Sequence, residues 1–235
     1  MSPSRDGRPL TAATASPAFT PMPVAKPAKG VFLVATQAMP DPRFWHSVIL
    51  LLLHDETGTL GLIVNHPTDL RMDKVLPDLA QSVKWRYPLF YGGPVARDIL
   101  LFLVGDRAFG EGLEPILPDR VFFSGDRTVL ERLLAADPPP ERLRLYLGHA
   151  GWAPQQLEAE LARGGWRLFR ADPTLLFHES PQSIWDLFLM QPGLMTFQQV
   201  PAEQRVRRSA QEDAAAQYSK DRVWVSSLDA VAPLP

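Results

Sequence analysis

Two almost wholly apolar segments, separated by a short polar stretch, limit the folds open to this chain more than any other feature. Ser47–Leu53 and Leu60–Asn65 lie on either side of residues 54–59, which contain Gly58. A glycine-containing loop between two strand-sized apolar segments predicts a β-hairpin. Ser47–Leu53 shows no polar alternation, so neither of its faces suits contact with water. We therefore expect this strand in the middle of a sheet that is covered on both sides.

Other short apolar segments predict further strands, and segments with helical spacing lie between the later ones. Strands are expected at residues 31–36, 89–91, 99–104, 121–123, 143–147 and 166–169. Helices are expected at residues 69–79, 126–135, 154–162 and 183–190, the second with Asp126 as its N-cap. The predicted core is Val48, Leu50, Leu52, Leu62, Val64, Leu101, Leu145 and Leu147. Because strands first cluster and then alternate with helices, the pattern favours an α+β fold over a regular doubly wound sheet.

Composition excludes several classes of site and partner. The 235 residues include no cysteine, which rules out disulfides, thiol catalysis and cysteine-ligated metal sites. The net charge of −2 gives no electrostatic reason to expect direct nucleic-acid binding. No apolar run approaches the ~20 residues that span a bilayer, and the N-terminus lacks the apolar region of a signal peptide. We expect a cytoplasmic protein with no membrane partner.

The composition changes at Gly30, which suggests a domain boundary. Residues 1–29 are rich in Ala, Pro, Ser and Thr and are expected to form a disordered N-terminal extension, with an organelle transit peptide as the alternative. Residues 30–200 are expected to form one domain. Residues 201–235 are more polar and form a C-terminal extension whose order the sequence leaves open.

Histidines and carboxylates near the open end of the hairpin raise two chemical possibilities. With the turn centred near Glu56, His46 lies opposite His66, and Asp41 and Asp69 flank the strands. Two imidazoles and a carboxylate can bind zinc or iron, but two unrelated histidines fit the pattern as well. We predict that the histidines are near each other and hold no metal, and we expect no cofactor. Ser47, His46 and Asp41 are adjacent in sequence, which is not the geometry of a catalytic triad.

Four segments carry more glycine, proline and polar character than packing requires: Met39–Phe44, Asn65–Pro67, Gly92–Val95 and Gly148–Trp152. Each is expected where a strand ends, and the last would lead into a helix whose N-terminus can attract an anion. The hypothesis is that at least two share a concave patch that binds a small polar ligand or a partner's peptide. The rival is four independent tight turns. The candidate surface residues are Met39, Asp41, His54, Asn65, His66, Gly92, Gly93, His149, Gly151 and Trp152.

Several collinear motifs between Gly30 and Met190 resemble the YqgE/AlgH family. They include residues 32–41, 47–51, 60–65, 91–95, 150–152 and 171–173. The resemblance implies a single compact α+β domain, in which a mixed β-sheet curls into a partial barrel surrounded by helices. It also implies a bacterial cytosolic protein with no agreed activity, and the family name suggests a connection with transcriptional regulation.

The chain departs from the family pattern at four positions near these motifs. Gln37 stands where the resemblance implies proline, Leu53 where it implies glutamate, His66 where it implies arginine, and His149 where it implies tyrosine. A site shared by the family would be altered here if it uses the lost carboxylate or guanidinium.

The absence of a cofactor motif or credible triad favours a non-catalytic regulatory protein that binds a small ligand or another protein. The alternative is a hydrolase-like enzyme that uses His54, Asn65 and His66 in loops at strand ends. Direct DNA binding is suggested by the family name alone, and the near-neutral charge counts against it.

Overall fold

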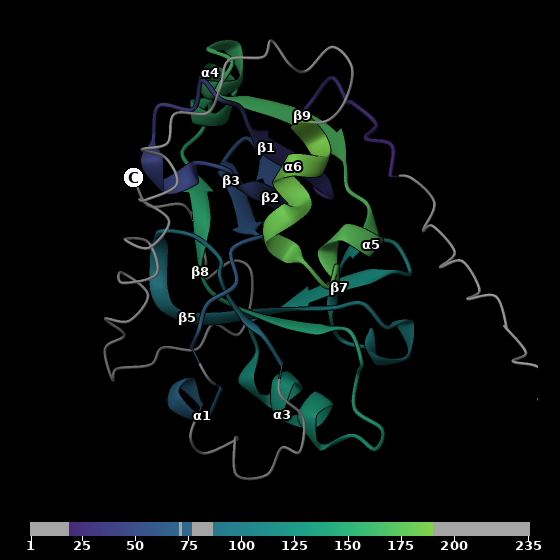
Figure 1. Cartoon of the computed structure of the whole chain (residues 1–235). Helices are drawn as coiled ribbons and strands as arrows, with labels where there is room; N and C mark the ends of the chain where they lie inside the picture. The colour runs from purple at the N-terminus through teal and green to yellow at the C-terminus, as the bar shows by residue number, and fades with distance from the viewer. Residues whose placement is uncertain (1–18, 71, 77–86, 190–235) are drawn as a thin grey trace, which may run out of the picture.

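The two apolar segments form a hairpin in the middle of a large sheet. The structure is a computed structural model that describes residues 19–70, 72–76 and 87–189 (Figure 1). Strands β2 (Val48–Asp55) and β3 (Gly58–Ile63) are antiparallel, with Leu50 opposite Leu62. Residues 48–52 of β2 are fully buried, so both faces of this strand are covered, as its unbroken apolar sequence predicts.

The hairpin belongs to a nine-stranded sheet within the described part of the chain. The strand order is β6-β7-β5-β8-β3-β2-β1-β9, and β4 pairs with β8 in parallel while the other pairs are antiparallel. The remaining strands are β1 (Val31–Ala35), β4 (Leu89–Tyr91), β5 (Val95–Val104), β6 (Glu114–Leu117), β7 (Val121–Ser124), β8 (Leu143–Trp152) and β9 (Trp166–Arg170).

The sheet curls until β6, at one end of the strand order, meets the chain just before β1. Lys29 forms an ion pair with Glu114 of β6. Gly30 has φ +76°, and a Cβ atom at this position would lie 2.9 Å from the backbone oxygen of Ile116. Only a residue without a side chain allows so close an approach. The contact closes part of a barrel, which confirms the curled, partly barrel-like sheet of an α+β fold.

Short helices cover the sheet. They are α1 (Met72–Val75), α3 (Arg127–Ala135), α4 (Gln156–Ala162), α5 (Pro173–Leu176) and α6 (Ile184–Leu189), with 3-10 turns η1 (Pro42–Phe44), η2 (Arg107–Phe109) and η3 (Pro181–Ser183). Helix α6 lies across β1, β2 and β3 (Figure 1), and the rings of its Phe188 and of Phe32 meet edge to face with centroids 6.1 Å apart. Helix α3 packs Leu130 and Leu133 on the side formed by β5 and β8.

The predicted core is confirmed. Each of the eight side chains is at most 2% exposed: Val48, Leu50, Leu52, Leu62, Val64, Leu101, Leu145 and Leu147.

The N-cap of α3 is also as predicted from sequence. The Asp126 carboxylate accepts hydrogen bonds from the backbone nitrogens of Thr128 (2.7 Å) and Val129 (3.2 Å). Asp126→Ala is expected to lower the free energy of unfolding by about 1 kcal/mol, because both donors lose their acceptor. Urea denaturation measures the change, and Asp126→Ser, which keeps an acceptor, is the control. Equal stability of the wild type and the alanine variant would contradict the capping role.

Strand β8 is longer than expected, and this corrects the interpretation of Gly148–Trp152 as a turn. Gly148 has φ +70°, which makes the strand irregular without ending it. Beyond it, Ala150 lies opposite Gly61 and Trp152 opposite Thr59, so β8 gains a new partner strand, β3. The segment therefore lies within the sheet, and the following helix begins at Gln156 instead of Pro154.

The N-terminal boundary also differs from the expected one. The backbone nitrogen of Val24 donates to Leu168 (3.1 Å) and that of Arg170 donates to Met22 (2.8 Å), so this segment lines the edge of β9. The ring of Phe19 packs on Phe188 with centroids 5.3 Å apart. Residues 19–29 thus belong to the folded domain and not to a disordered extension. Residues 1–18, the expected domain end at residue 200 and the extension 201–235 lie outside the described residues.

No helix within the described ranges combines the length and the apolar content that crossing a membrane requires.

Candidate functional site

Three of the four polar segments adjoin one another near the open end of the β2–β3 hairpin: Asn65–Pro67, Gly92–Val95 and Gly148–Trp152. The backbone nitrogen of Ile63 donates to Gly92 (2.8 Å), that of Tyr91 to His66 (2.9 Å), and that of Gly92 to Leu147 (2.8 Å). The segments around residues 65, 92 and 148 are therefore in direct contact. The fourth joins them through Phe44, whose ring stacks on Trp152 with centroids 6.1 Å apart. Whether this region binds anything remains a prediction.

The glycines in this region serve close packing of backbones. A Cβ atom at Gly92 would lie 2.2 Å from the backbone oxygen of Gly148, and one at Gly93 would lie 2.2 Å from the carbonyl of His149. Both glycines are buried, whereas Gly151 is half-buried. The space that a side chain would fill is already taken by β8, so Gly92 and Gly93 offer no room for a ligand.

Asn65 holds the open end of the hairpin together. Its side chain is 2% exposed; Oδ1 accepts from the backbone nitrogen of Val48 (2.8 Å) and Nδ2 donates to the carbonyl of His46 (2.8 Å). His46 has φ +58°, which turns the chain away before β2 begins. The amide thus replaces backbone pairing that the turn removes. Its donor and acceptor are both occupied by this chain's own backbone.

The predicted proximity of His46 and His66 stays a prediction. The pairing of the two strands ends at Ile49 opposite Ile63, before either histidine is reached. The ring of His46 lies 4.3 Å, centroid to centroid, from that of Trp185. Among the described residues, no group of three or more His, Cys, Asp or Glu side chains is arranged to hold a metal ion.

His149 is a buried imidazole without a partner. The residue is 1% exposed, and neither ring nitrogen has a hydrogen-bond partner. Burial lowers the pKa of His149 to about 4, because the charged ring would lose its hydration. The side chain is therefore neutral at physiological pH and sits inside the fold.

His54 forms the arrangement closest to a hydrolytic triad. Its Nδ1 lies 2.8 Å from the hydroxyl of Thr59, and its Nε2 lies 3.5 Å from a carboxylate oxygen of Glu158. Thr59, however, is 2% exposed, so a substrate cannot reach the hydroxyl. Ser47 is fully buried as well. Thr59 lies near the turn of the hairpin and Ser47 at its open end, and the burial of both hydroxyls argues against a hydrolase that uses either one.

The other candidate residues divide between packing and surface. Trp152 is 1% exposed and donates its indole N–H to Glu160 (3.0 Å), which also accepts from Trp166 (2.7 Å). Met39 is 6% exposed. Asp41 is half-buried and pairs with Arg43 (2.7 Å), whose side-chain hydrogen bonds lower the pKa of that carboxyl. Burial therefore corrects the proposed surface: Met39, Asn65, Gly92, Gly93, His149 and Trp152 lie inside the fold, and Asp41, His54, His66 and Gly151 remain accessible in part.

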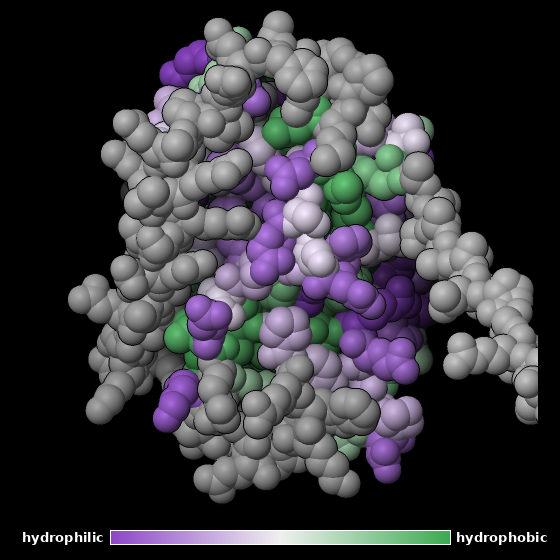
Figure 2. Space-filling view, in the orientation of Figure 1, coloured by the Kyte–Doolittle hydropathy of each residue, from purple (hydrophilic) through white to green (hydrophobic). Residues whose placement is uncertain are grey.

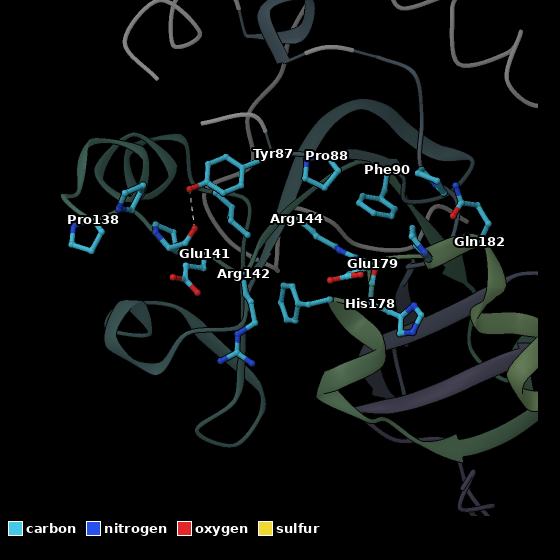
Figure 3. Close-up of a pocket in the computed structure, with 16 residues that line it drawn as sticks. Tyr87, Pro88, Phe90, Pro138, Glu141, Arg142, Arg144, His178, Glu179 and Gln182 are labelled. Atoms are coloured by element: carbon cyan, nitrogen blue, oxygen red, sulfur yellow. Dashed lines mark hydrogen bonds between the residues drawn. The ribbon is translucent and has the colours of Figure 1, made fainter. Parts of the chain in front are cut away.

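A cavity of about 680 Å³ lies elsewhere, between the β4–β8 pair and the segment that joins α5 to η3. Figure 3 shows Arg144 extending toward Phe90 and His178 at one end, with Tyr87 and Pro138 at the other. Of the four polar segments, Asn65–Pro67 alone contributes a lining residue, Pro67. The walls are mainly aromatic rings and prolines, and three consecutive prolines occupy positions 138–140.

Arg144 is the most unusual group in this cavity. The residue is 6% exposed, and its guanidinium carbon lies 4.6 Å from the centroid of Phe90 and 5.9 Å from that of Phe177. Nη2 donates to the carbonyl oxygen of His178, whereas Nη1 is buried without an acceptor. No carboxylate in the described part of the chain forms an ion pair with it. Burial lowers the pKa of Arg144 from its usual value, yet an arginine stays protonated in proteins.

The sequence offers one signal for Arg144, which points the wrong way. Leu143, Leu145 and Leu147 alternate with Arg144 and Tyr146, a pattern typical of a strand with one wet face. In the structure Phe90 and the segment after α5 cover the second face, so the arginine and the tyrosine are both buried. That cover comes from residues distant in sequence.

Comparison with known proteins finds a family model and relatives that match most of the domain. Residues 32–196 match the family model described as AlgH-like. A UPF0301 protein of Ruegeria pomeroyi is 36% identical over 171 residues, which cover 70% of this chain and 91% of that protein. A UPF0301 protein of Streptomyces coelicolor is 38% identical over 161 residues, covering 66% of this chain and 82% of that protein.

Two solved structures share the fold. A crystal structure of a Corynebacterium diphtheriae protein has a TM-score of 0.60 at 28% identity and covers 73% of this chain and 91% of its own. The solution structure of the AlgH protein from Pseudomonas aeruginosa has a TM-score of 0.51 at 27% identity and covers 85% of this chain and all of its own. The chain therefore belongs to the AlgH-like family, as the collinear motifs that resemble the YqgE/AlgH family predict.

Proposed function

We propose that this chain is a non-catalytic, ligand-binding regulatory protein of the bacterial cytoplasm, whose small-molecule ligand occupies the cavity between β8 and the α5–η3 segment. The observation that carries the proposal is the cavity itself. Its volume of about 680 Å³ falls in the range of small-molecule pockets. Its apolar wall with a few polar groups is the usual composition of such pockets.

The hydrolase alternative has weaker support. Its best arrangement, His54 with Thr59 and Glu158, has a buried hydroxyl that no substrate can approach. The cavity contains His178, but no serine or threonine lines it with that imidazole. A pocket without an accessible nucleophile fits binding better than hydrolysis.

A large apolar docking surface for a protein partner is not evident on the described residues. Met22 is the one large hydrophobic side chain among them that is mostly exposed, at 57%. In the view of Figure 2, polar side chains cover much of the described surface, and apolar ones gather in small patches. The net charge of −2 also gives no support for direct DNA binding. A link to transcriptional regulation is the finer form of the proposal, and it rests on the family resemblance alone.

Filling the cavity tests the proposal. Gln182 lines the cavity from η3 and is exposed, so Gln182→Trp is expected to fill part of the space without disturbing the core. Native mass spectrometry of the purified protein, followed by a thermal-shift screen of small molecules, identifies binders. The expected result is at least a tenfold loss of affinity in Gln182→Trp, since a blocked pocket loses most of its contacts.

Gln37→Trp is the matched control, because this exposed glutamine precedes η1 and does not line the cavity. It is expected to bind as the wild type does. The proposal fails if the binders bind equally well to Gln182→Trp, or if the screen yields no binder.

A further inference from the structure

We propose that the ligand of this cavity is an organic monocarboxylate with an apolar body, whose carboxylate is held by the guanidinium of Arg144. The inference rests on the proposed function and adds the chemical class of the ligand. It depends on the one buried cation of the cavity lining, Arg144, with which no carboxylate of the described residues forms an ion pair.

The first argument is the missing counter-ion. Arg144 is 6% exposed, and within the described ranges no carboxylate forms an ion pair with it. The carbonyl oxygen of His178 accepts from Nη2, and the Tyr146 hydroxyl lies beside the guanidinium. Both of these groups are neutral. A buried charge is strongly disfavoured unless it is paired and hydrogen-bonded. A bound anion would supply the opposite charge.

The second argument is that the guanidinium is held in place before any ligand arrives. Its carbon lies 4.6 Å from the ring centroid of Phe90 and 5.9 Å from that of Phe177. Cation–π contacts with the two rings stabilise the guanidinium, but the quadrupole of an aromatic ring does not neutralise its positive charge. A planar, fixed guanidinium matches the planar carboxylate group, with which it forms strong charge-assisted hydrogen bonds.

Tyr146 lies beside the guanidinium on the same face of β8. Its hydroxyl interacts with Arg144, and burial raises the pKa of Tyr146, so the hydroxyl stays protonated and neutral. A neutral hydroxyl leaves the charge of Arg144 uncompensated. Tyr146 is fully buried and does not line the cavity, so the ligand would contact the guanidinium and not this hydroxyl.

The charge balance of the cavity favours a single negative charge. Arg142 lines the rim together with Glu141 and Glu179, and all three residues are exposed. Exposed charges are well hydrated and contribute little to binding. A monoanion would neutralise Arg144, whereas a dianion such as a phosphate monoester would bring a surplus negative charge.

The walls indicate the rest of the ligand. Pro88, Phe177 and the prolines at 138–140 give the cavity an apolar lining. The Tyr87 hydroxyl donates to the carbonyl of Pro140 (2.8 Å), which ties the two sides of this wall together. An apolar body packs on such a surface once its polar end is satisfied at Arg144.

The test compares two probes that differ in charge and little else. Calorimetry measures the binding of 3-phenylpropanoate and of its neutral amide, 3-phenylpropanamide, to the full chain. The wild type is expected to bind the carboxylate at least about tenfold more tightly, which is the usual effect of one charge-assisted hydrogen bond. Phenylethylphosphonate, at a pH where it is a dianion, is expected to bind more weakly than the carboxylate.

Two variants assign the preference to one residue. Arg144→Met keeps the apolar length of the side chain and is expected to bind the two probes within about twofold of each other. Arg167→Met, which removes an exposed guanidinium of β9 that does not line the cavity, is expected to keep the wild-type preference. Equal binding of carboxylate and amide by the wild type would overturn the inference, and this comparison needs no variant to fold.

The outcomes separate the two proposals. The monocarboxylate is wrong, while the binding function stands, in either of two cases. In the first, a neutral molecule binds the wild type and loses affinity in Gln182→Trp. In the second, the wild type prefers the amide. If the dianion binds more tightly than the carboxylate, the charge argument is wrong. If neither probe binds at millimolar concentration, this ligand class is overturned, and the screen for binders decides the proposed function alone.

Discussion

Asn65→Ala is expected to lower the free energy of unfolding by about 3 kcal/mol. The substitution leaves the buried N–H of Val48 without its acceptor and removes the hydrogen bond to the half-buried carbonyl of His46. An unsatisfied buried group typically costs about 1–3 kcal/mol, and the loss of the second bond adds to this cost. Because the amide of Asn65 takes the place of strand pairing where β2 begins, no nearby backbone can replace it. Urea denaturation at neutral pH measures the loss.

The matched control is Gln37→Ala, which removes the amide of an exposed side chain. This variant is expected to change the free energy of unfolding by less than about 0.5 kcal/mol. If Asn65 instead belonged to the shared binding patch expected from the sequence, the substitution would leave folding intact and weaken binding. Wild-type stability of Asn65→Ala would restore that interpretation.

The hairpin was predictable because its two segments are apolar on both faces. That pattern has one physical solution, a central strand pair. The turn at residues 56–57 sets the register only as far as Leu53, because the pairing shifts between Leu51 and Leu53. The same reasoning identifies the buried core residues and the N-cap at Asp126. Local sequence is sufficient for these features because each depends on residues close together in the chain.

The role of the strand-end motifs was not predictable in the same way. Glycines such as Gly92, Gly93 and Gly148 are typical of loops. Here they are needed because the backbone around residues 92–93 approaches the backbone of β8 closely. A glycine that permits close packing and one that permits a turn look alike in sequence. The resulting contact joins β8 to segments some 50 residues earlier, and nothing local to Gly148 indicates it.

The cavity was missed for a related reason. Arg144 alternates with leucines, a pattern that predicts a strand with one face in water and a surface arginine. Its burial depends on Phe90 and Phe177, which are far from it in sequence.

His149 is expected to make the fold sensitive to mild acid. Its pKa is about 4 in the folded protein and about 6.5 for an unburied imidazole. Between these values the unfolded chain binds more protons than the folded chain, so stability falls as the pH falls. The full contribution is present above about pH 6.5, and about 3 kcal/mol is lost once the pH is below about 4. At about pH 4.5 most of this loss is expected.

His149→Leu isolates this contribution, because the ring nitrogens have no partners that the substitution would leave unsatisfied. At neutral pH the variant is expected to be about as stable as the wild type, since an apolar side chain suits the buried position. Urea denaturation of both proteins at about pH 7.5 and about pH 4.5 gives the difference in pH dependence, while equal m-values show that the unfolded states match. Carboxylates titrate in the same range, but they do so in both proteins, and subtracting one pH dependence from the other removes them. If wild type and variant lose the same stability on acidification, His149 is not the group responsible, and its ring must have found a partner or water in solution.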